Sequence, residues 1–388
     1  MSTAGGYRRA TTVTCVHVLF VTRKFPPQTG GMETLAQDTY DALLAGGSRV
    51  TLLRNVRSDW HSWWWLPLTL VRMARVVRTD RPDVVLLGDA LMNAVATWLL
   101  RRHRVPHATM VMGLDVTFDS SVYRKIVVRH LRAAPLIIAI SNATATAVRA
   151  AGVEEDRLVV LRLSVAPPED MESRDAARAR LRRRIGVGEE TAVLLTLGRL
   201  VRRKGVAWFA AQVLPFARHD VVHLVAGAGP AEDRIRRAAR SRGVEDKVRL
   251  LGRVSREDRE LLLRGSDLFV QPNIHVYGDM EGFGLVNVEA AVRDLPVLAA
   301  DIEGIPDAVV DGETGWLVTS QDAPRWRLQL ERLLGDLDAL RASGEAFGAT
   351  ARDLYSPQRF ADGLQALLRR VADGEHTAHE LHEERNRP

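Results

Sequence analysis

Short segments that are apolar at every position recur along this chain and alternate with stretches of helical periodicity. In the first half, the segments expected to form strands are residues 16–22, 49–54, 83–88, 108–112, 136–141 and 157–163. Buried strands of this kind, separated by helices, are typical of a parallel sheet that helices cover on both faces. The first half therefore predicts one α/β domain.

A second series of strands follows a change in composition. Residues 167–190 are charged, begin with two prolines and contain no apolar strand, so we expect a linker and a helix that leaves the first domain. After them, the expected strands are residues 192–198, 221–227, 247–252, 267–272 and 296–300. A length of 388 residues also favours two domains over a single core. We predict two doubly wound, parallel-sheet domains that face a cleft.

The composition narrows the class of protein. Hydrophobic residues make up 46% and charged residues 26% of the chain, which is typical of a folded globular protein. No apolar run approaches the roughly 20 residues of a membrane-spanning helix, and residues 13–22 fit a strand better than a signal peptide. The one cysteine, Cys15, permits no internal disulfide, so we expect a cytoplasmic protein.

The formal net charge of +6 would suit nucleic acid, an anionic membrane or phosphorylated substrates. The basic residues are nearly all arginines that alternate with acidic residues, as in RLRRRIGVGEE. No aromatic residues for base stacking accompany them. We therefore expect no nucleic-acid partner.

Four segments of the second half each begin where an expected strand ends: residues 197–205, 225–230, 281–290 and 303–318. In an open parallel sheet, ligands bind beyond the carboxyl ends of the strands, so all four segments can face one crevice. In the first segment, Arg199 and Lys204 lie five residues apart on a loop that leads into a helix. A guanidinium with two parallel donors and a compact ammonium suit a diphosphate, although such a pair is also common on a solvated surface.

The third segment places Glu281 and Glu289 on either side of the sequence Gly282-Phe283-Gly284. Glycines at a helix start let a ligand approach the backbone, where free N–H groups and the helix dipole attract phosphate. Helix geometry over this spacing separates the carboxylates by about 12 Å, too far for the acid and nucleophile of a retaining glycosidase. We expect Glu281 to contact a sugar and Glu289 ribose hydroxyls of one extended ligand. Two solvated glutamates on an amphipathic helix are the alternative.

The segments GRLVRRKG, GAGP and EGFGLVNVEA, in this order and spacing, resemble retaining glycosyltransferases of the GT-B fold, in particular glycosyltransferase family four. PPQTGGMETLA resembles the first loop of that family, EGIPDAVVDGETGWLV its late signature, and YSPQRFADGLQALL its closing helices. The resemblance implies two Rossmann-like domains, an acceptor-binding domain at residues 1–168 and a donor-binding domain at 169–355. Residues 356–388 would form a helix that returns to the first domain, followed by a polar tail.

The resemblance also implies an activity and a set of site residues. A hexose or deoxyhexose would pass with retention from a nucleoside diphosphate sugar to a hydroxyl group of a glycan, a lipid or a natural product, without a metal or other cofactor. The implied catalytic residues are Arg199, Lys204, Glu281 and Asp115. The implied donor-binding residues are Gly30 and Gly31 at the phosphates, Arg253 and Val254 at the nucleobase, Glu289 at the ribose, and Met112, Gly282, Phe283, Gly284 and Leu285 around sugar and phosphate.

Three positions depart from the family pattern. Met112-Gly113-Leu114-Asp115 stands where the family commonly has H-G-x-D, whose histidine usually contacts the sugar near its sixth carbon. Met112 would make that part of the pocket apolar and suit a deoxysugar, unless the substitution is simply tolerated or the register differs. Glu303 replaces a common glycine, and LRLSVAPP replaces an Asn-Gly-Val turn. Both leave the geometry between the domains open.

Residues 59–78, DWHSWWWLPLTLVRMARVVR, contain four of the eight tryptophans, followed by arginines at helical spacing. Interfacial aromatic residues and a basic helical face are what a peripheral membrane contact requires. We therefore consider a contact of residues 60–78 with the inner membrane surface or with an apolar acceptor. Ordinary packing of this helix on its sheet is the alternative.

Other motifs indicate different functions, but each of these motifs is incomplete. GAGP lacks the third glycine of a dinucleotide-binding fingerprint, since Glu232 occupies that position. Asp336-Leu337-Asp338 resembles a metal-binding pair but lies in a helical stretch. The eleven histidines show no metal-ligand spacing, so no metal site is expected beyond weak adventitious binding by His376, His379 and His382 of the polar tail. The functional alternatives are a nucleotide-sugar epimerase or phosphorylase on the same fold, or a GT-B scaffold whose activity Met112 impairs.

Overall fold

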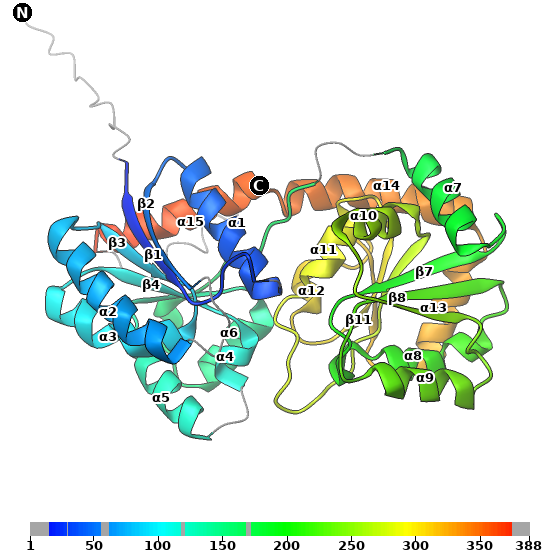
Figure 1. Cartoon of the computed structure of the whole chain (residues 1–388), viewed down its shortest axis with the longest axis horizontal. Helices are drawn as coiled ribbons and strands as arrows, with labels where there is room; N and C mark the ends of the chain where they lie inside the picture. The colour runs from blue at the N-terminus through cyan, green and yellow to red at the C-terminus, as the bar shows by residue number, and fades with distance from the viewer. Residues whose placement is uncertain (1–14, 29, 56–61, 118–120, 168–171, 375–388) are drawn as a thin grey trace, which may run out of the picture.

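The computed structural model of the chain describes residues 15–28, 30–55, 62–117, 121–167 and 172–374. Figure 1 shows two lobes, each built around one sheet, with two late helices that run along both. The prediction of an α/β fold with two doubly wound parallel sheets is confirmed. The boundary predicted at residues 168–169, the polar tail after residue 374 and residues 60–61 of the tryptophan tract lie outside the described residues.

The first lobe holds six parallel strands in the order β2-β1-β3-β4-β5-β6. They are β1 (His17–Thr22), β2 (Arg49–Arg54), β3 (Val84–Leu87), β4 (His107–Val111), β5 (Leu136–Ala139) and β6 (Leu158–Val160). All six coincide with strands predicted from the sequence. Strand β1 pairs with β2 in the register that sets His17 opposite Arg49. Strands β1, β3, β4 and β5 are buried at every position, as strands covered on both faces must be.

The second lobe repeats this arrangement with the strand order β12-β11-β10-β7-β8-β9. Its strands are β7 (Ala192–Leu197), β8 (Val221–Ala226), β9 (Val248–Gly252), β10 (Leu268–Gln271), β11 (Val297–Asp301) and β12 (Trp316–Thr319). Five of them coincide with predicted strands. Strand β12 does not coincide with a predicted strand. It lies at the edge of the sheet and is for the most part only partly buried, so its sequence is not apolar at every position.

The helices of the first lobe connect the strands of its sheet. They are α1 (Gly31–Ala45), α2 (Ser62–Thr79), α3 (Ala90–His103), α4 (Gly113–Thr117), α5 (Ser121–Leu131), α6 (Asn142–Ala150) and the 3-10 turn η2 (Glu155–Arg157). Side chains fix two of the helix starts directly after strands. Asp89 accepts a hydrogen bond from the backbone N–H of Met92 at 3.0 Å, and Ser141 from that of Thr144 at 3.0 Å.

The helices of the second lobe are α7 (Arg174–Ile185), α8 (Val206–Gln212), α9 (Glu232–Ser241), α10 (Arg256–Gly265), α11 (Leu285–Ala291), α12 (Ile305–Ala308) and α13 (Ala323–Leu334), with the 3-10 turns η3 (Arg202–Lys204) and η4 (Leu214–Phe216). The sequence predicts one helix over residues 208–217, but α8 ends at Gln212 because Pro215 follows and cannot continue the helical hydrogen bonding. The expectation that α7 leaves the first domain is also wrong. Helix α7 packs against α10, and its Arg182 binds the buried Asp267 of the second lobe at 2.9 Å.

The last two helices join the lobes. Helix α14 (Leu337–Leu354) packs on α11, and α15 (Pro357–Ala372) packs on α1 of the first lobe, as Figure 1 shows along the upper edge. The chain crosses between them at the buried Tyr355, whose carbonyl oxygen accepts a hydrogen bond from the N–H of Val165 at 3.0 Å. The ring of Tyr355 lies edge-to-face on Phe283, with 6.2 Å between ring centroids. Residues 161–167, the described part of the unusual LRLSVAPP segment, thus run beside this crossing at Val165.

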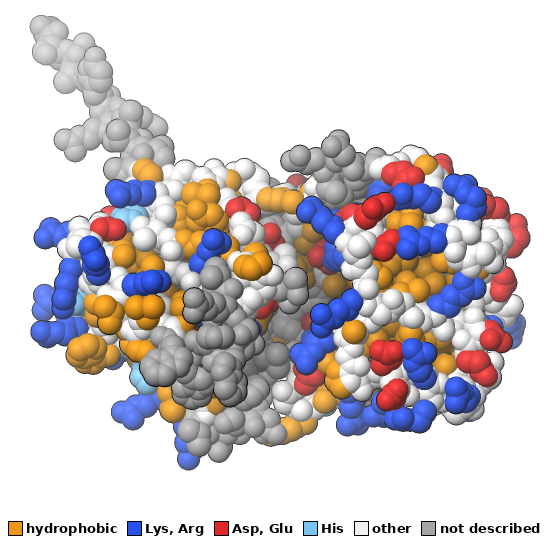
Figure 2. Space-filling view, viewed as in Figure 1, with side chains coloured by type: hydrophobic (Ala, Val, Ile, Leu, Met, Phe, Trp, Pro, Cys, Tyr) orange, Lys and Arg blue, Asp and Glu red, His pale blue; other side chains and the backbone are white. Residues whose placement is uncertain are grey.

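Helix α2 carries part of the tryptophan tract and has one buried and one exposed face. Its Met73 and Val77 are buried on the sheet, so it packs in the ordinary way. Its outer face exposes 47% of Leu68 and 68% of Val71 among arginine side chains. Figure 2 shows hydrophobic and basic side chains side by side over this part of the first lobe. No helix in the part of the chain that the structure describes is long and apolar enough to span a membrane.

Candidate active site

The loop after β7 turns sharply into α8, and Gly205 makes this turn possible. Its φ is +67°, and a Cβ at this position would lie 1.7 Å from the carbonyl oxygen of Pro272, so no other residue fits without displacing the backbone. The close approach sets η3, with Lys204, beside the end of β10. Two segments that are about seventy residues apart in the sequence thereby meet at the carboxyl edge of the second sheet.

The carboxylate of Glu281 is the centre of this meeting point. Its Oε2 atom accepts hydrogen bonds from Lys204 Nζ at 2.6 Å, from Asn273 Nδ2 at 3.1 Å and from Arg203 Nη1. Gln271 Nε2 lies 3.5 Å from the same oxygen. Among the described residues none donates a hydrogen bond to Oε1, so this oxygen can accept one from a ligand.

Burial determines how the charges of this cluster behave. Lys204 and Glu281 are only 7% and 8% exposed. Burial by itself would raise the pKa of Glu281, but the charges of Lys204 and Arg203 outweigh it and lower this pKa to about 2. Burial lowers the pKa of Lys204, against the opposing charge of Glu281. Glu281 is therefore ionised at physiological pH and acts only as a hydrogen-bond acceptor.

Arg199 does not join this cluster. Its side chain is exposed, and it forms no ion pair with a residue in the described ranges. Arg203 takes the place beside Lys204, because its Nε atom lies 3.0 Å from Asp279 Oδ1 while Nη1 binds Glu281. Sequence analysis missed Arg203, since the R-x4-K pattern drew attention to Arg199 and left the intervening arginines as surface charge. The only available signal was the RRK run itself.

The turn from Glu281 to Gly284 precedes helix α11. Gly284 has φ +86°, and a Cβ there would lie 2.8 Å from Asn287 Nδ2, so glycine is needed at the start of this helix. Phe283 is buried against Tyr355. The use of helix geometry for the Glu281–Glu289 spacing is wrong, because α11 begins only at Leu285. Glu289 lies on the helix, where its carboxylate accepts a hydrogen bond from Arg259 of α10.

Glu303 holds the backbone of the Glu281 turn. Its φ of +53° is uncommon for a residue with a Cβ and matches the glycine that the family pattern has at this position. Its Oε2 atom accepts a hydrogen bond from the backbone N–H of Glu281 at 2.6 Å. Its Oε1 atom lies 3.5 Å from Nδ1 of His275, whose side chain is largely exposed. The departure from glycine thus keeps the backbone conformation and adds a contact to the site.

The first lobe touches the site through Met112 and Gly113. A Cβ on Gly113 would lie 2.1 Å from Cε of Met280 and 3.5 Å from Cα of Gly282, so the two lobes meet here at van der Waals distance. Met112 is half-buried and packs against the main apolar core. Met280 of the second lobe thus approaches the Met112–Gly113 turn at Gly113.

Asp115 lies behind this junction rather than in the open part of the site. It is 4% exposed, and its Oδ2 atom accepts a hydrogen bond from the N–H of Met112 at 2.9 Å. Burial and the neighbouring charge of Asp89 raise its pKa to about 7. This placement suits a residue that holds the Met112–Gly113 turn.

The remaining predicted site residues lie on loops at the carboxyl ends of strands. Gly30 and Gly31 are exposed at the start of α1, where a Cβ on Gly30 would lie 2.4 Å from the Glu33 carboxylate. Arg253 and Val254 follow β9, with Arg253 exposed and Val254 half-buried. Among the described residues, neither loop forms a hydrogen bond or ion pair with Glu281, so their roles rest on the resemblance.

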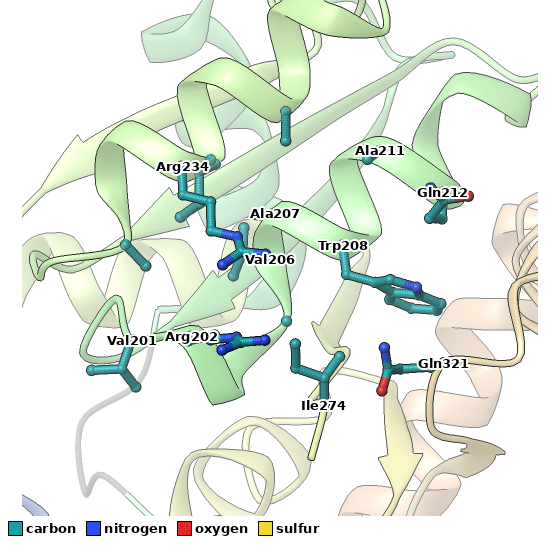
Figure 3. Close-up of a pocket in the computed structure, with 14 residues that line it drawn as sticks. Val201, Arg202, Val206, Ala207, Trp208, Ala211, Gln212, Arg234, Ile274 and Gln321 are labelled. Atoms are coloured by element: carbon teal, nitrogen blue, oxygen red, sulfur yellow. The ribbon is translucent and has the colours of Figure 1, made fainter. Parts of the chain in front are cut away.

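A pocket of about 310 Å³ lies between α8 and α9 on the other side of η3. Figure 3 shows Arg202 and Arg234 extending into it, with Trp208, Ile274 and Gln321 opposite. None of the residues predicted for the active site lines this pocket. The three residues of η3 therefore have different contacts: Arg202 lines the pocket, while Arg203 and Lys204 bind Glu281.

The structure has two parallel-sheet lobes, a helix that returns from the second lobe to the first, and a cationic turn that contacts the carboxylate of an E-G-F-G segment. This is the architecture of a GT-B glycosyltransferase. Comparison with family profiles agrees. Residues 177–348 match the family described as glycosyl transferases group 1, and residues 4–164 match the one described as glycosyl transferase 4-like domain. The chain belongs to the group 1 glycosyltransferases, which confirms the resemblance to family four.

Curated relatives support the same family. A GDP-mannose-dependent alpha-(1-6)-phosphatidylinositol monomannoside mannosyltransferase of Mycobacterium tuberculosis is 27% identical over 93% of this chain and 99% of its own length. An alpha-D-kanosaminyltransferase of Streptomyces kanamyceticus is 29% identical over 51% of this chain and 50% of its own. A D-inositol 3-phosphate glycosyltransferase of Corynebacterium aurimucosum is 34% identical over 44% and 42%. The chain thus spans half or less of the latter two relatives.

Solved structures share the fold. Sucrose-phosphate synthase from Thermosynechococcus elongatus superposes with a TM-score of 0.74 at 18% identity, covering 92% of this chain and 100% of that one. The HepE protein of Anabaena, solved in complex with UDP and glucose, gives a TM-score of 0.69 at 19% identity and covers 91% and 99%. Identities this low show the common fold and nothing about substrates.

Proposed function

We propose that this chain is a retaining hexosyltransferase that moves a hexose or deoxyhexose from a nucleoside diphosphate sugar to a hydroxyl group. The observation that carries the proposal is the buried contact of Lys204 with Glu281 at the end of β10. In one place of the site, this pair offers a cation to a departing diphosphate and a carboxylate oxygen to sugar hydroxyls. Membership of the group 1 glycosyltransferases supports the same activity.

In the proposed reaction, the bond between the anomeric carbon and the diphosphate oxygen breaks while the acceptor oxygen bonds to that carbon. Arg199 and Lys204 stabilise the negative charge that grows on the diphosphate. Arg199 suits this role because its exposed guanidinium can bind phosphate without first leaving a carboxylate. The acceptor attacks from the side that the leaving group vacates, and its proton passes to a phosphate oxygen, so the configuration is retained.

The rest of the donor is bound along the carboxyl edges of both sheets. Glu281 Oε1 accepts a hydrogen bond from the transferred sugar, and Glu289 binds the ribose hydroxyls. The backbone amides from Gly282 to Leu285 contact sugar and phosphate, and those of Gly30 and Gly31 approach the phosphates from the first lobe. Arg253 and Val254 meet the nucleobase. Asp115 acts by holding the Met112–Gly113 turn, since its carboxylate binds Met112 N.

The donor sugar is proposed to be deoxygenated or modified at its sixth carbon. Met112 stands where the family pattern has a histidine, and Met280 approaches the same turn from the second lobe. A thioether in place of the imidazole removes a strong hydrogen-bond partner for a sugar hydroxyl, which is unfavourable for a buried polar group. Turnover across a panel of donors tests this. A strong preference for a hexose with a free 6-hydroxyl would contradict it.

The acceptor is proposed to approach over the first lobe, with α2 as a peripheral membrane contact or apolar binding face. The exposed Leu68 and Val71 support this placement. Co-sedimentation with anionic phospholipid vesicles tests the membrane version at physiological salt. Binding should fall in a Leu68→Asp, Val71→Asp variant and persist in Leu328→Asp, which changes a leucine that is 73% exposed on the second lobe. Equal binding by all three proteins would contradict a membrane contact through α2.

A thermal-shift screen of UDP-, GDP-, ADP- and dTDP-sugars tests the proposed function. A donor present at about 100 times its Kd should stabilise the folded chain by about 2.7 kcal/mol. Hydrolysis of that donor without an acceptor then separates an enzyme from an inactive scaffold of the same fold. Absence of both a thermal shift and hydrolysis for every donor would contradict the proposal.

A further inference from the structure

Arg203 of η3 binds two carboxylates at once and also anchors a neighbouring loop. Its Nη1 atom donates to Glu281 Oε2, and its Nε atom lies 3.0 Å from Asp279 Oδ1. Its carbonyl oxygen accepts a hydrogen bond from the N–H of Ile274 at 2.8 Å. The side chain is only 16% exposed, so these contacts are largely shielded from water.

These contacts fix the loop of residues 272–280, which connects β10 to the Glu281 turn. Arg203 holds the loop near its start, through Ile274, and near its end, through Asp279. Met280 at the end of the loop meets Gly113 of the first lobe. Figure 1 shows the segment between β10 and α11 as a long loop on the side that faces the first lobe. Arg203 therefore links the sugar-binding carboxylate to a loop that touches both lobes.

Lys204 has two competing partners in the proposed reaction. Its ammonium binds Glu281 at 2.6 Å in the structure, and the proposed chemistry also requires it at the diphosphate. A diphosphate that draws Lys204 away would leave the buried Glu281 carboxylate with less positive charge, which is strongly unfavourable in a shielded site. Arg203 binds the same oxygen, Oε2, and has a second carboxylate partner in Asp279.

We propose that Arg203 is a positioning residue that remains with Glu281 as its counter-ion while Lys204 engages the diphosphate. This inference rests on the proposed function and assigns a different role to each of the two cations. A guanidinium suits the role because its fixed fork of donors can bind Asp279 and Glu281 together, whereas an ammonium is a single compact charge. The sugar-binding oxygen thus keeps its charge and direction throughout the reaction.

The charged or titratable groups in the surroundings of Glu281 come from three segments: Arg203 and Lys204 of η3, His275 and Asp279 of the loop, and Glu303 before α12. Asp279 and Glu303 carry the wrong sign to replace Arg203. His275 is 71% exposed and faces Glu303 rather than Glu281. Among the described residues, Arg203 and Lys204 are the cations bound to Glu281, so removal of Arg203 leaves Lys204 to serve both partners.

The test compares Arg203→Gln and Arg203→Lys with Arg202→Gln as the matched control. Arg202 is the neighbouring arginine, is exposed and lines the separate α8–α9 pocket (Figure 3). The readout is acceptor-free hydrolysis of the nucleotide sugar that gives the wild-type chain its largest thermal shift. Rates are measured from about pH 5 to about pH 8 and expressed as the ratio of variant to wild type, so that unrelated titrations cancel.

For Arg203→Gln, the kcat ratio should fall about tenfold between about pH 7.5 and about pH 5.5. Without Arg203, donor binding raises the pKa of Glu281, and the carboxylate becomes protonated as the pH falls. Arg203→Lys should restore a level ratio but raise KM about fivefold, because one ammonium cannot also hold Asp279. Arg202→Gln should give a ratio near one at every pH.

A level ratio for Arg203→Gln, whatever its absolute rate, would overturn the counter-ion role. An unchanged KM for Arg203→Lys would overturn the bridge to Asp279. Melting curves verify that each variant folds, and if Arg203→Gln does not, the KM of Arg203→Lys decides alone. Failure of the wild-type chain to bind or hydrolyse any nucleotide sugar would instead contradict the proposed function on which this inference rests.

Discussion

Asn142 of the first lobe binds both carboxylate oxygens of Asp307 in the second lobe. Its backbone N–H donates to Oδ2 at 2.8 Å, and its Nδ2 donates to Oδ1 at 2.6 Å. Asp307 is 3% exposed, and its carbonyl oxygen accepts a hydrogen bond from the hydroxyl of Tyr355 at 3.0 Å. Because α12 also follows the Glu303 turn that supports Glu281, this contact fixes the lobe-to-lobe geometry close to the candidate site.

Asp307→Ala should lower kcat/KM for donor hydrolysis by about tenfold, because two donors of Asn142 lose their acceptor and the lobes are no longer held at this point. Affinity for the free nucleoside diphosphate should change little, since that ligand is proposed to bind mainly to the second lobe. Steady-state kinetics and titration calorimetry measure the two effects, with Asp353→Ala, an exposed carboxylate on α14, as the control. An equal loss in both measurements would contradict a role in lobe geometry.

The acid stability of the chain should depend on Glu281. Its pKa is lowered from 4.5 to about 2, so the unfolded state binds more protons than the folded state between these values. The stabilisation is therefore present above about pH 4.5 and is lost as the pH falls towards 2. The difference between the two pKa values corresponds to about 3 kcal/mol.

Chemical denaturation of wild type and Glu281→Gln at a series of pH values measures this contribution. Glu281→Gln should be less stable than wild type at pH 7, because Lys204 and Arg203 lose their counter-ion in a buried site. The gap between the two proteins should narrow as the pH falls below about 4.5. A gap that stays constant with pH would show that the Glu281 charge is not coupled to folding.

Two glycines of the second lobe should respond very differently to alanine. Gly205→Ala should destabilise the chain by about 2 kcal/mol or more, because its φ is +67° and the new Cβ meets the backbone oxygen of Pro272. Gly188→Ala should be nearly neutral, since a Cβ there has no heavy atom within 4 Å. Thermal melts of the two variants provide the comparison. Similar melting temperatures would contradict the close packing of η3 on β10.

Much of the fold could be predicted because its signal is local. Short apolar runs predict eleven of the twelve strands. The twelfth, β12, is missed because an edge strand needs no continuous apolar sequence. The break between α8 and η4 required weighing Pro215 against a strong helical pattern. The assignment of α7 depended on contacts of Arg182 with Asp267, which no local pattern reveals.

The candidate site could be predicted only in part. Lys204 and Glu281 were expected at one crevice, and they are in direct contact. Their sequence spacing could not show that Arg203 takes the position next to them while Arg199 stays exposed, because side-chain direction in a 3-10 turn is set by tertiary packing. The same holds for Asp115, whose burial behind the Met112 turn follows from the way α4 meets its neighbours.

The central claim is that a diphosphate binds at Arg199 and Lys204, and calorimetric titration of the nucleoside diphosphate into wild type and an Arg199→Ala, Lys204→Ala variant tests it most directly. The double variant should bind about 100-fold more weakly, because two charge-assisted contacts are lost while Arg203 still balances Glu281. Unchanged affinity in a variant that melts like wild type would contradict the claim.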